Sequence, residues 1–499
     1  MKCPVKHHGV SKASGCGHVA VTTFSRLFPD SVPNLTLTEE EAAIIGGPGG
    51  LMHDFDGSTE DSPIPAGYIF FAQFIDHDVT LDTTSGLRDA PKNAKEVSEL
   101  PNIRSASLDL DCVYGFGPEA SPHIYDAERP GRLAVNPNGF DLARSPGGVA
   151  LIGDPRNDEN IFVAQMQLLF HRFHNRIYNE RVEGGERFEE AQKETRYHYQ
   201  WLVLFDFLKR LCDREVYKFA VPKILKKTEE YPFLFDPDES GRLTMPVEFS
   251  VAAYRVGHTL VRSEYAVNAD NLDVELFDER FGTLGFSGYP EDLVVDWRYM
   301  LDVDECIRPR LSKAVDEKLA NELQSLPLPV VNSNSPNDCA LAFRNLLRGN
   351  ALGLPSGQDA AKALKAAGYP IEVTNLELDG IPGWERLDRI ADGEKSPLRD
   401  NTPLFYYVLR ESEVLHKGER FGPVGSAILL EVFGGMLNNC ESFINAEKEW
   451  NPDPCISKEM RSKRWASEYQ ERFNRKALIE RDDYFPFELA DVVRFVEGD

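Results

Sequence analysis

The sequence predicts one large, mainly α-helical domain with long irregular loops and very few short strands. Apolar residues recur at three- and four-residue steps over long stretches, which is the pattern of a buried helix face. Strand patterns are few and short, as in SEYAVNA at 263–269. A length of 499 residues would allow two to four domains, but no repeat and no low-complexity linker divides the chain.

Three segments are expected along this domain. Residues 1–60 are rich in Gly, Pro, Ser and Thr and are predicted to form an N-terminal arm that wraps the core. Residues 61–450 carry the strongest helical patterns and are predicted to be the main domain. Residues 451–499 are expected to be a helical C-terminal extension packed on the same domain.

Two long helices are predicted within the main domain. In residues 161–178 the apolar positions share one helix face. Residues 186–211 are acidic at their start and basic at their end, as the helix dipole favours. Shorter buried helices are expected at 248–261, 339–349 and 422–437.

Charge and composition exclude several classes of function. Asp and Glu number 81 against 55 Lys and Arg, which gives a net charge of −26. Nucleic acids and anionic membranes are bound mainly through Lys and Arg, so neither is an expected partner. No stretch is apolar for the roughly 18 to 20 residues that span a membrane, and no secretory signal is visible. A cytoplasmic location is the default expectation, with signal-less secretion as the alternative.

The eight cysteines lack the regular spacing of a disulfide scaffold, so reduced thiols are expected. Several Cys and His residues near the N-terminus either belong to a flexible arm or hold a metal. Their spacing fits no familiar zinc pattern, which favours the arm. These residues are Cys3, His7, His8, Cys16 and His18.

The segment FAQFIDHDVTLD places polar groups in an apolar run. On a helix, Gln73, Asp76 and His77 share one face, and Asp78 is rotated from His77 by about 100°. Burying such groups costs several kcal/mol unless each has a partner or a ligand. The helix therefore presents a histidine and a carboxylate to one site and a second carboxylate to another, or it is an exposed helix with a structural histidine.

A second cluster of polar residues lies in RSASLDLDCVYG. Ser105, Asp109, Asp111 and the intervening carbonyls offer several hard oxygen ligands within one short loop. Such ligands suit Ca²⁺ better than a softer metal. The alternative interpretation is a solvated acidic turn.

Three further motifs are ambiguous when each is taken alone. In GDPRNDENIFVAQ, Arg156 and Glu159 form either a functional pair or an ion pair at the start of a helix. In AAYRVGHTLVR, His258 is either a core residue or an axial haem ligand. In RNLLRGNALGLPSGQ, Asn345 and Arg348 precede a Gly-Leu-Pro turn.

Taken together and in order, the motifs resemble those of the animal-type haem peroxidase superfamily, the group of myeloperoxidase and lactoperoxidase, which also has bacterial members. The distal signature is similar to AQFIDHD, the arginine signature to GDPRNDEN and the following helix to HRFHNRI. The proximal signature is similar to YRVGHTL, and the last motif to N-L-L-R followed by GLP. The resemblance extends from about Ile64 to Phe433 and suggests a bacterial-type member.

The resemblance implies roles for residues on both sides of a haem. His77 would be the distal acid–base for H₂O₂, Arg156 the distal cation and Gln73 the ligand of a distal water or halide. His258 would be the proximal iron ligand, and Asn345 would accept a hydrogen bond from its other ring nitrogen.

The resemblance also implies how a haem b would be held. Arg348 and Arg255 would pair with its propionates. Asp76 and Glu159 stand where the animal enzymes form ester links to the haem. Asn160 stands where myeloperoxidase has a methionine that forms a third link, so that link should be absent.

The family's calcium ligands correspond to residues in two segments of this chain. The family pattern has Thr, Phe and Ser at the positions of Ser105, Ser107 and Asp111, so ligation there departs from the pattern. The expected ligands are Asp78, Ser105, Ser107 through its carbonyl, Asp109 and Asp111.

The implied activity is that of a haem peroxidase, with a link to oxidative stress. It would reduce H₂O₂ through high-valent states of the iron and oxidise a halide, thiocyanate or a small phenol. A fatty-acid dioxygenase of the same fold is one alternative. Those enzymes use a tyrosine three residues before the proximal histidine. This chain has Arg255 at that position, and Tyr254 lies one residue further back. A non-catalytic haem- or calcium-binding protein is another, although it would not need His77 or Arg156.

Overall fold

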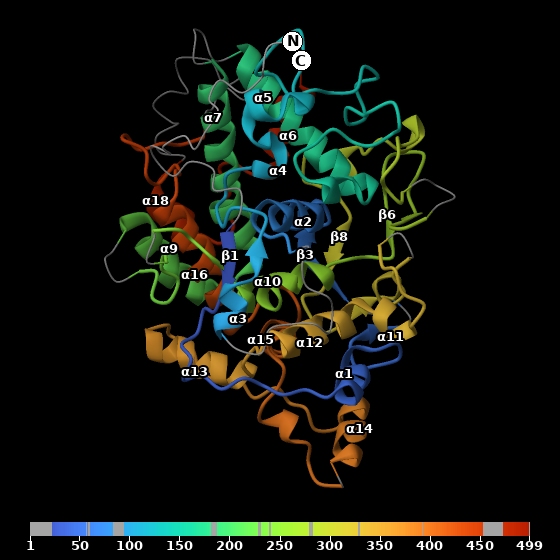
Figure 1. The fold of residues 1–499 in the computed structure, drawn as a ribbon, viewed down its shortest axis with the longest axis vertical. Coiled ribbons are helices and arrows are strands. Elements are labelled where there is room, and N and C mark those ends of the chain that lie inside the picture. Colours follow the sequence, from blue (N-terminus) through green and yellow to red (C-terminus); the bar gives the residue numbers. More distant parts are fainter. Residues whose placement is uncertain are drawn as a thin grey trace.

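Helix α2, Gly67–Val79, lies at the centre of the fold, with α6 and α7 on one side and α10, α12 and α15 on the other (Figure 1). All of its residues are buried except Gln73 and Asp76, which are half-buried. The helix ends because Thr80 adopts an extended backbone and turns its hydroxyl back to the Asp76 carbonyl. The predicted helix in the segment FAQFIDHDVTLD is therefore confirmed, and it is the core of the molecule.

A computed structural model of the chain describes residues 22–55, 57, 60–82, 94–180, 187–227, 231–238, 241–278, 283–327, 330–391, 393–452 and 473–498. The N-terminal Cys and His residues lie outside these ranges, and so do the first 21 residues of the predicted arm. None of the helices in the described ranges has the length and apolar character that crossing a bilayer requires.

The two long predicted helices are confirmed. Helix α6, Ile161–Glu180, begins where the Asn160 side chain accepts hydrogen bonds from the backbone N–H groups of Phe162 and Val163, an N-cap. Helix α7, Arg187–Leu202, continues through one π-helical stretch, Val203–Phe207, into α8, Leu208–Leu211. Helices α6 and α7 pack on each other, and α6 also packs on α2.

The predicted helix at 248–261 is wrong in its form. Two short elements replace it: α10, Val247–Ser250, and the 3₁₀ helix η4, Ala253–His258. They are separated because Ala252 leaves helical geometry, with φ −125° and ψ −76°. In a 3₁₀ helix residues three apart eclipse one another, so Arg255 and His258 lie on the same side of η4.

The remaining helices pack around α2, α6 and α7 (Figure 1). The helices predicted at 339–349 and 422–437 are observed as α12 and α16. Helix α1 begins with a capping box between Thr38 and Glu41. The other helical elements are α1 Glu39–Gly46, α3 Ala94–Ser98, α4 Asp111–Tyr114, α5 Gly117–Ala120, η1 Pro122–Ile124, η2 Pro155–Asp158, α9 Arg214–Lys226, η5 Glu291–Leu293, η6 Trp297–Tyr299, η7 Asn321–Gln324, α11 Pro336–Cys339, α12 Leu341–Ala351, α13 Gly357–Ala367, α14 Pro382–Ile390, η8 Pro397–Arg399, α15 Leu404–His416, α16 Pro423–Asn439, α18 Arg475–Glu480 and α19 Leu489–Glu497.

Strands are short and form small separate sheets, as the sequence predicts. One sheet has the order β4-β1-β5, with β1 antiparallel to β4 and parallel to β5. Three two-stranded sheets pair β2 with β9, β3 with β8 and β6 with β7. The strands are β1 Thr22–Ser25, β2 His53–Asp54, β3 Asp61–Pro65, β4 Pro101–Asn102, β5 Met245–Pro246, β6 Glu264–Tyr265, β7 Val274–Glu275, β8 Leu311–Lys313 and β9 Leu319–Ala320. The mainly helical fold class is thus confirmed.

Candidate active site

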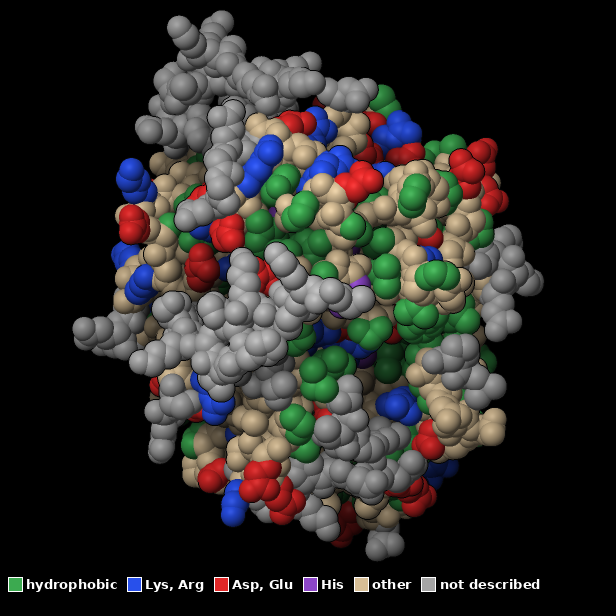
Figure 2. All heavy atoms as spheres, turned by 45° about the horizontal axis from the view of Figure 1, so that its top comes forward, with side chains coloured by type: hydrophobic (Ala, Val, Ile, Leu, Met, Phe, Trp, Pro, Cys, Tyr) green, Lys and Arg blue, Asp and Glu red, His purple; other side chains and the backbone are tan. Residues whose placement is uncertain are grey.

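A cavity of about 290 Å³ lies between α2, η2 and η4. Its polar lining comes from the motifs that the sequence singled out, and includes His77, Arg156 and His258. Its apolar lining comes partly from α2, through Ile69, Phe70 and Ala72, and partly from other segments, chiefly Leu276, Phe277, Leu323, Leu326, Val330 and Leu341. In the space-filling view, histidine atoms are visible among hydrophobic and basic side chains where the surface is hollowed (Figure 2).

His77 meets the cavity with one of its two ring nitrogens. Its Nδ1 lies 2.7 Å from Oδ1 of Asn157, so Nε2 is the nitrogen left for a ligand in the cavity. Burial, together with the charge of Arg156, lowers the pKa of His77 to about 4. The imidazole is therefore neutral at pH 7 and can accept a proton.

Arg156 is fixed beside His77 by a buried carboxylate, that of Asp154. Asp154 Oδ2 accepts from Arg156 Nη2 at 2.8 Å, and Oδ1 accepts from its Nε at 3.1 Å. The same Nη2 donates to the backbone carbonyls of Thr80, at 2.6 Å, and His77, at 3.2 Å. The guanidinium therefore also holds the C-terminal end of α2.

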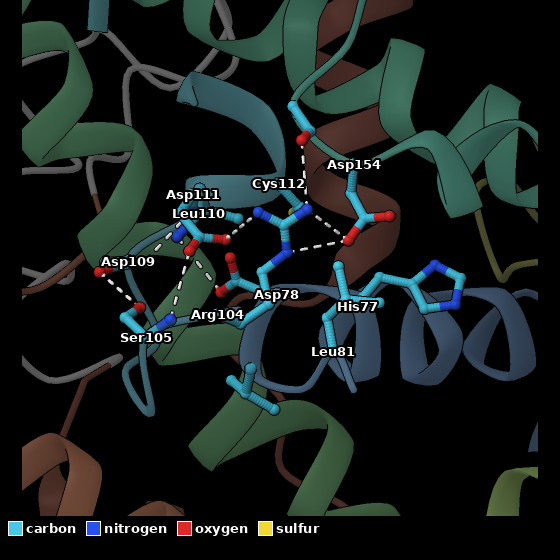
Figure 3. Close-up of polar contacts among 12 residues, drawn as sticks. His77, Asp78, Leu81, Arg104, Ser105, Asp109, Leu110, Asp111, Cys112 and Asp154 are labelled. Atoms are coloured by element: carbon cyan, nitrogen blue, oxygen red, sulfur yellow. Dashed lines mark hydrogen bonds and ion pairs between the residues drawn. The ribbon is translucent and has the colours of Figure 1, made fainter. Parts of the chain in front are cut away.

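The Asp154 carboxylate binds a second arginine, Arg104 (Figure 3). Arg104 donates to Asp154 Oδ2 from Nη2 at 2.6 Å and from Nε at 2.9 Å, and its Nη1 lies 3.6 Å from Asp111 Oδ1. Burial alone would raise the pKa of Asp154, but Arg156, then His77 and Arg104, lower it well below its usual range. Asp154 is a charged group with no exposed surface, held between two cations.

Gln73 and Glu159 contact each other at the cavity wall, with the Gln73 amide donating to the Glu159 carboxylate. Gln73 also accepts a hydrogen bond from Asn160 at 3.3 Å. Burial, only partly offset by Arg156, raises the pKa of Glu159 to about 7. Glu159 is thus partly protonated near neutral pH.

His258 borders the cavity from η4, and the Asn345 side chain on α12 lies behind it. The Asn345 amide nitrogen is 3.0 Å from His258 Nδ1. Burial, together with Arg255, lowers the pKa of His258 to about 3, so the ring is neutral. The predicted pairing brings the two residues together. In this orientation, however, Asn345 donates, and its amide must turn by 180° to accept from an Nδ1–H.

The two arginines expected at the propionates have different surroundings. Arg255 lines the cavity, and its Nη1 lies 3.7 Å from Asp76 Oδ2. Burial opposes ionisation of Asp76, but Arg255, then His77 and Arg156, lower its pKa. Arg348 does not line the cavity and instead donates to Asp82 at 2.5 Å.

Three carboxylates gather on the opposite side of α2 from the His77 ring, as Figure 3 shows. Each of them offers one carboxylate oxygen, and these three oxygens, from Asp78, Asp109 and Asp111, lie within 4.8 Å of one another. Asp78 Oδ2 accepts from Tyr199 and from the Leu110 backbone, whereas Asp78 Oδ1 is buried without a hydrogen-bond partner among the described residues.

The rest of the predicted calcium loop surrounds these carboxylates. Ser105 Oγ donates to Asp109 at 2.9 Å, and the Ser105 backbone N–H donates to Asp111 at 3.4 Å. Ser107 lies in the same loop. Burial and the charge of Asp109 raise the pKa of Asp78 to about 7. Mutual repulsion of this kind is relieved when a cation binds.

The structure brings together most of the predicted site residues and adds others that sequence reasoning missed. Asp154, Asn157, Gln167 and Arg104 hold the predicted residues in place from behind. Asp154 and Asn157 stand beside Arg156 in GDPRNDEN, and Arg104 opens RSASLDLDCVYG, but Gln167 lies outside the quoted motifs. The local signal for Asp154 is its place directly before a Pro, where an Asp commonly caps a helical turn.

Comparisons with known proteins agree with this arrangement. A family model of animal haem peroxidases matches residues 84–365, more than half of the chain, and this match begins just after α2. Peroxidase A from Dictyostelium discoideum has a similar fold, with a TM-score of 0.60 and 15% identity over 95% of this chain and 93% of that one. The Oryza sativa fatty acid alpha-dioxygenase gives a TM-score of 0.55 and 16% identity over 92% and 79%. No protein of curated function gives a significant sequence match.

We expect Asp154→Asn to lower the free energy of unfolding at pH 7 by about 3–5 kcal/mol, because it leaves the buried Arg104 and the half-buried Arg156 without their carboxylate. The pKa of Asp154 is lowered on folding, so its contribution is complete above the ordinary Asp value of about 4 and is lost as the pH falls below it. Urea denaturation at pH 7 and at pH 3 measures both effects.

A matched control is Asp126→Asn, which removes a surface ion pair with Arg129. Such pairs contribute about 0–1 kcal/mol, so this variant should stay close to the wild type. If Asp154→Asn costs no more than the control, or if its cost does not shrink in acid, Asp154 does not have the role described.

Proposed function

The chain belongs to the animal haem peroxidase family, and we propose that it reduces hydrogen peroxide at a haem with electrons from a small donor. The observation that carries the proposal is that a neutral His77, a fixed Arg156 and a neutral His258 line one cavity. Halides, thiocyanate and small phenols are the donor classes we propose.

The residues of the cavity fit a haem. His258 offers a neutral imidazole to the iron, and the apolar wall offers surface to the porphyrin. Arg255 is the propionate partner at the cavity, whereas Arg348 would first have to leave Asp82. When bound, haem would supply the redox chemistry that divides the O–O bond.

The protein's own groups would handle protons and charge. His77 Nε2 would take the proton of H₂O₂ and hold it for return to the departing oxygen. Arg156 would stabilise the negative charge that develops on the peroxide, and it is already oriented by Asp154, so little reorganisation is needed. Gln73, which lines the same wall, would orient a water or a halide.

The dioxygenase alternative is supported by the fold it shares with the rice enzyme, one of whose structures contains palmitic acid. Against it, the position that eclipses His258 on η4 is Arg255. Tyr254 points elsewhere and donates its hydroxyl to the Ala72 carbonyl at 3.1 Å. These contacts favour a peroxidase.

The decisive experiment compares His77→Ala with His258→Ala. We expect His77→Ala to keep its haem and to react with H₂O₂ about 10²–10⁴-fold more slowly, because a general acid–base is lost. We expect His258→Ala to lose haem or to change its Soret band. Stopped-flow mixing with H₂O₂ and absorbance spectra measure the two outcomes.

Oxygen uptake with palmitic acid tests the alternative in the same preparations. A wild-type protein that consumes oxygen with the fatty acid and does not turn over H₂O₂ with any small donor would establish the dioxygenase. An unchanged peroxide rate in His77→Ala would remove the assigned role of that residue.

We also propose that Asp78, Asp109 and Asp111 bind Ca²⁺, with Ser105 and the Ser107 carbonyl completing the site. The unpartnered buried oxygen of Asp78 supports a cation there. Since Asp78 follows His77 on α2, the ion would fix the helix that orients His77. The extra carboxylate of Asp111, where the family has Ser, makes the site more acidic.

We expect the purified protein to contain one tightly held Ca²⁺ and chelation to lower its melting temperature. At a free Ca²⁺ concentration of 100 Kd, binding to the folded state alone contributes about 2.7 kcal/mol. Metal analysis measures the bound Ca²⁺, and thermal unfolding with and without chelator measures the change in melting temperature. Asp270→Asn, which removes a carboxylate on the surface, is the control and should keep the ion. Unchanged melting on chelation, or an Asp78→Asn variant that retains the ion, would contradict the site.

Ester links from Asp76 and Glu159 to haem methyl groups are the final part of the proposal. Both carboxyls line the cavity. We expect that after H₂O₂ treatment acid–acetone leaves part of the haem on the wild-type protein, and that the Asp76→Asn, Glu159→Gln double variant releases all of it. Complete extraction from the peroxide-treated wild type would show that no link forms.

A further inference from the structure

A chain of side-chain hydrogen bonds runs from His77 into the core, away from the cavity. His77 Nδ1 lies 2.7 Å from Asn157 Oδ1, and Asn157 Nδ2 donates to Gln167 Oε1 at 2.8 Å. Gln167 Nε2 lies 2.8 Å from His171 Nε2. The chain thus joins α2 to η2 and then to two residues one turn apart on α6.

Two backbone carbonyls end this chain. His171 Nδ1 lies 3.2 Å from the Ala134 oxygen, and Gln167 Nε2 also lies 3.3 Å from the Cys112 oxygen. Asn157, Gln167 and His171 have no exposed surface. Water therefore does not compete for these groups, and each contact has to be satisfied within the protein.

The two carbonyls determine the direction of every bond in the chain. A carbonyl oxygen can only accept, so His171 carries its proton on Nδ1 and Gln167 presents its NH₂ group to Cys112. The second N–H of Gln167 then donates to the bare Nε2 of His171. Gln167 Oε1 is left to accept from Asn157, whose Oδ1 must accept from His77.

The reverse direction fails at both ends. Turning the Gln167 amide would bring its oxygen against the Cys112 carbonyl, where two acceptors repel. It would also require His171 to donate from both ring nitrogens, which is the charged form. Burial lowers the pKa of His171 to about 4, so that form is absent at neutral pH.

We propose that Asn157, Gln167 and His171 are positioning residues that hold His77 as the tautomer with its proton on Nδ1, so that the lone pair on Nε2 faces the cavity. This deepens the proposed peroxidase function and rests on it for its purpose. Amides do not release a proton readily, so the chain fixes a tautomer and does not conduct protons. Only this tautomer can accept a proton from a ligand in the cavity.

His174 provides a matched control on the same helix. It too has no exposed surface and two hydrogen-bond contacts, to the Tyr114 hydroxyl at 3.0 Å and to the Gly131 carbonyl at 2.9 Å. Neither contact leads to His77. Replacing His171 or His174 by Leu therefore removes an equally buried histidine, but only the first change interrupts the chain.

The direct test is the tautomer of His77 in the wild-type protein. Long-range ¹H–¹⁵N correlation of ¹⁵N-histidine-labelled holoprotein, in its diamagnetic carbon monoxide form, reports which ring nitrogen carries the proton. The His77 signals are identified by their loss in His77→Gln. We expect a protonated Nδ1 and a bare Nε2, and a protonated Nε2 or a mixture of tautomers would overturn the proposal.

The variants test whether the chain is the cause. We expect His171→Leu to mix the tautomers of His77 and to slow the reaction with H₂O₂ by about 10–100-fold, a typical cost of losing such an outer partner. His171→Gln, which can accept from Gln167 and donate to the Ala134 carbonyl, should restore both, and His174→Leu should change neither. An equal effect of the two Leu variants, or no rescue by Gln, would contradict the proposal.

The two proposals fail separately. If the protein does not reduce H₂O₂ but His171→Leu still mixes the tautomers, the chain is as proposed and the peroxidase function is wrong. If the protein is a peroxidase whose His77 keeps its tautomer in His171→Leu, the function stands and the chain has no such role.

Discussion

The Asp154 carboxylate is the contact on which the site depends. A carboxylate with no exposed surface is very unfavourable alone, and here two guanidinium groups neutralise it. Those groups belong to Arg104, in the acidic loop, and Arg156, at the cavity. Arg156 also donates to the last carbonyls of α2. One buried charge therefore fixes three segments that are far apart in sequence.

The two sides of α2 differ in the charges that surround them. His77 and Asp76 face a cavity that contains Arg156 and Arg255, whereas Asp78 faces other carboxylates. Arg104 lies between the two sides, 3.6 Å from Asp111 and bonded to Asp154. A cation among the carboxylates would repel Arg104 toward Asp154. The charge among the carboxylates therefore affects the cavity electrostatically through Arg104 and Asp154.

The sequence predicts the helices and the residues that line the cavity better than it predicts the buried residues that hydrogen-bond to the cavity lining from behind. Periodicity identifies α2 and α6, because their apolar faces are long and regular. It fails at η4, where Ala252 departs from helical geometry although its neighbours keep the apolar pattern. His77, Arg156 and His258 lie in recognisable motifs. Asn157 lies in one of them too, but its role has no sequence pattern, nor has that of Gln167, because a buried amide acquires its partners only from neighbours brought by folding.

The same limit applies to Arg348. Its place in a motif suggests a haem propionate, but in the structure it binds Asp82, which follows α2 directly. Spacing identifies which residues share a region, and the three-dimensional neighbours decide which partner each one has. For Asn345 the pairing that the family resemblance implies is present, since the residue does lie against His258.

The division of the cavity lining has a consequence for how such a protein can change over evolutionary time. The polar residues sit on α2, η2 and η4. Asp154 holds Arg156 on η2, and the backbone N–H groups of Gly285 and Phe286 donate to the carbonyls of Glu159 and Asp158 at the end of η2. Part of the apolar lining comes from segments outside these three elements, around Leu276 and Leu323. Substitutions there would alter the shape of the cavity without moving the groups to which proton transfer is assigned in the proposed function. Under the proposed function, lineages can therefore exchange one reducing substrate for another through substitutions in these segments, while the residues assigned to peroxide chemistry stay unchanged.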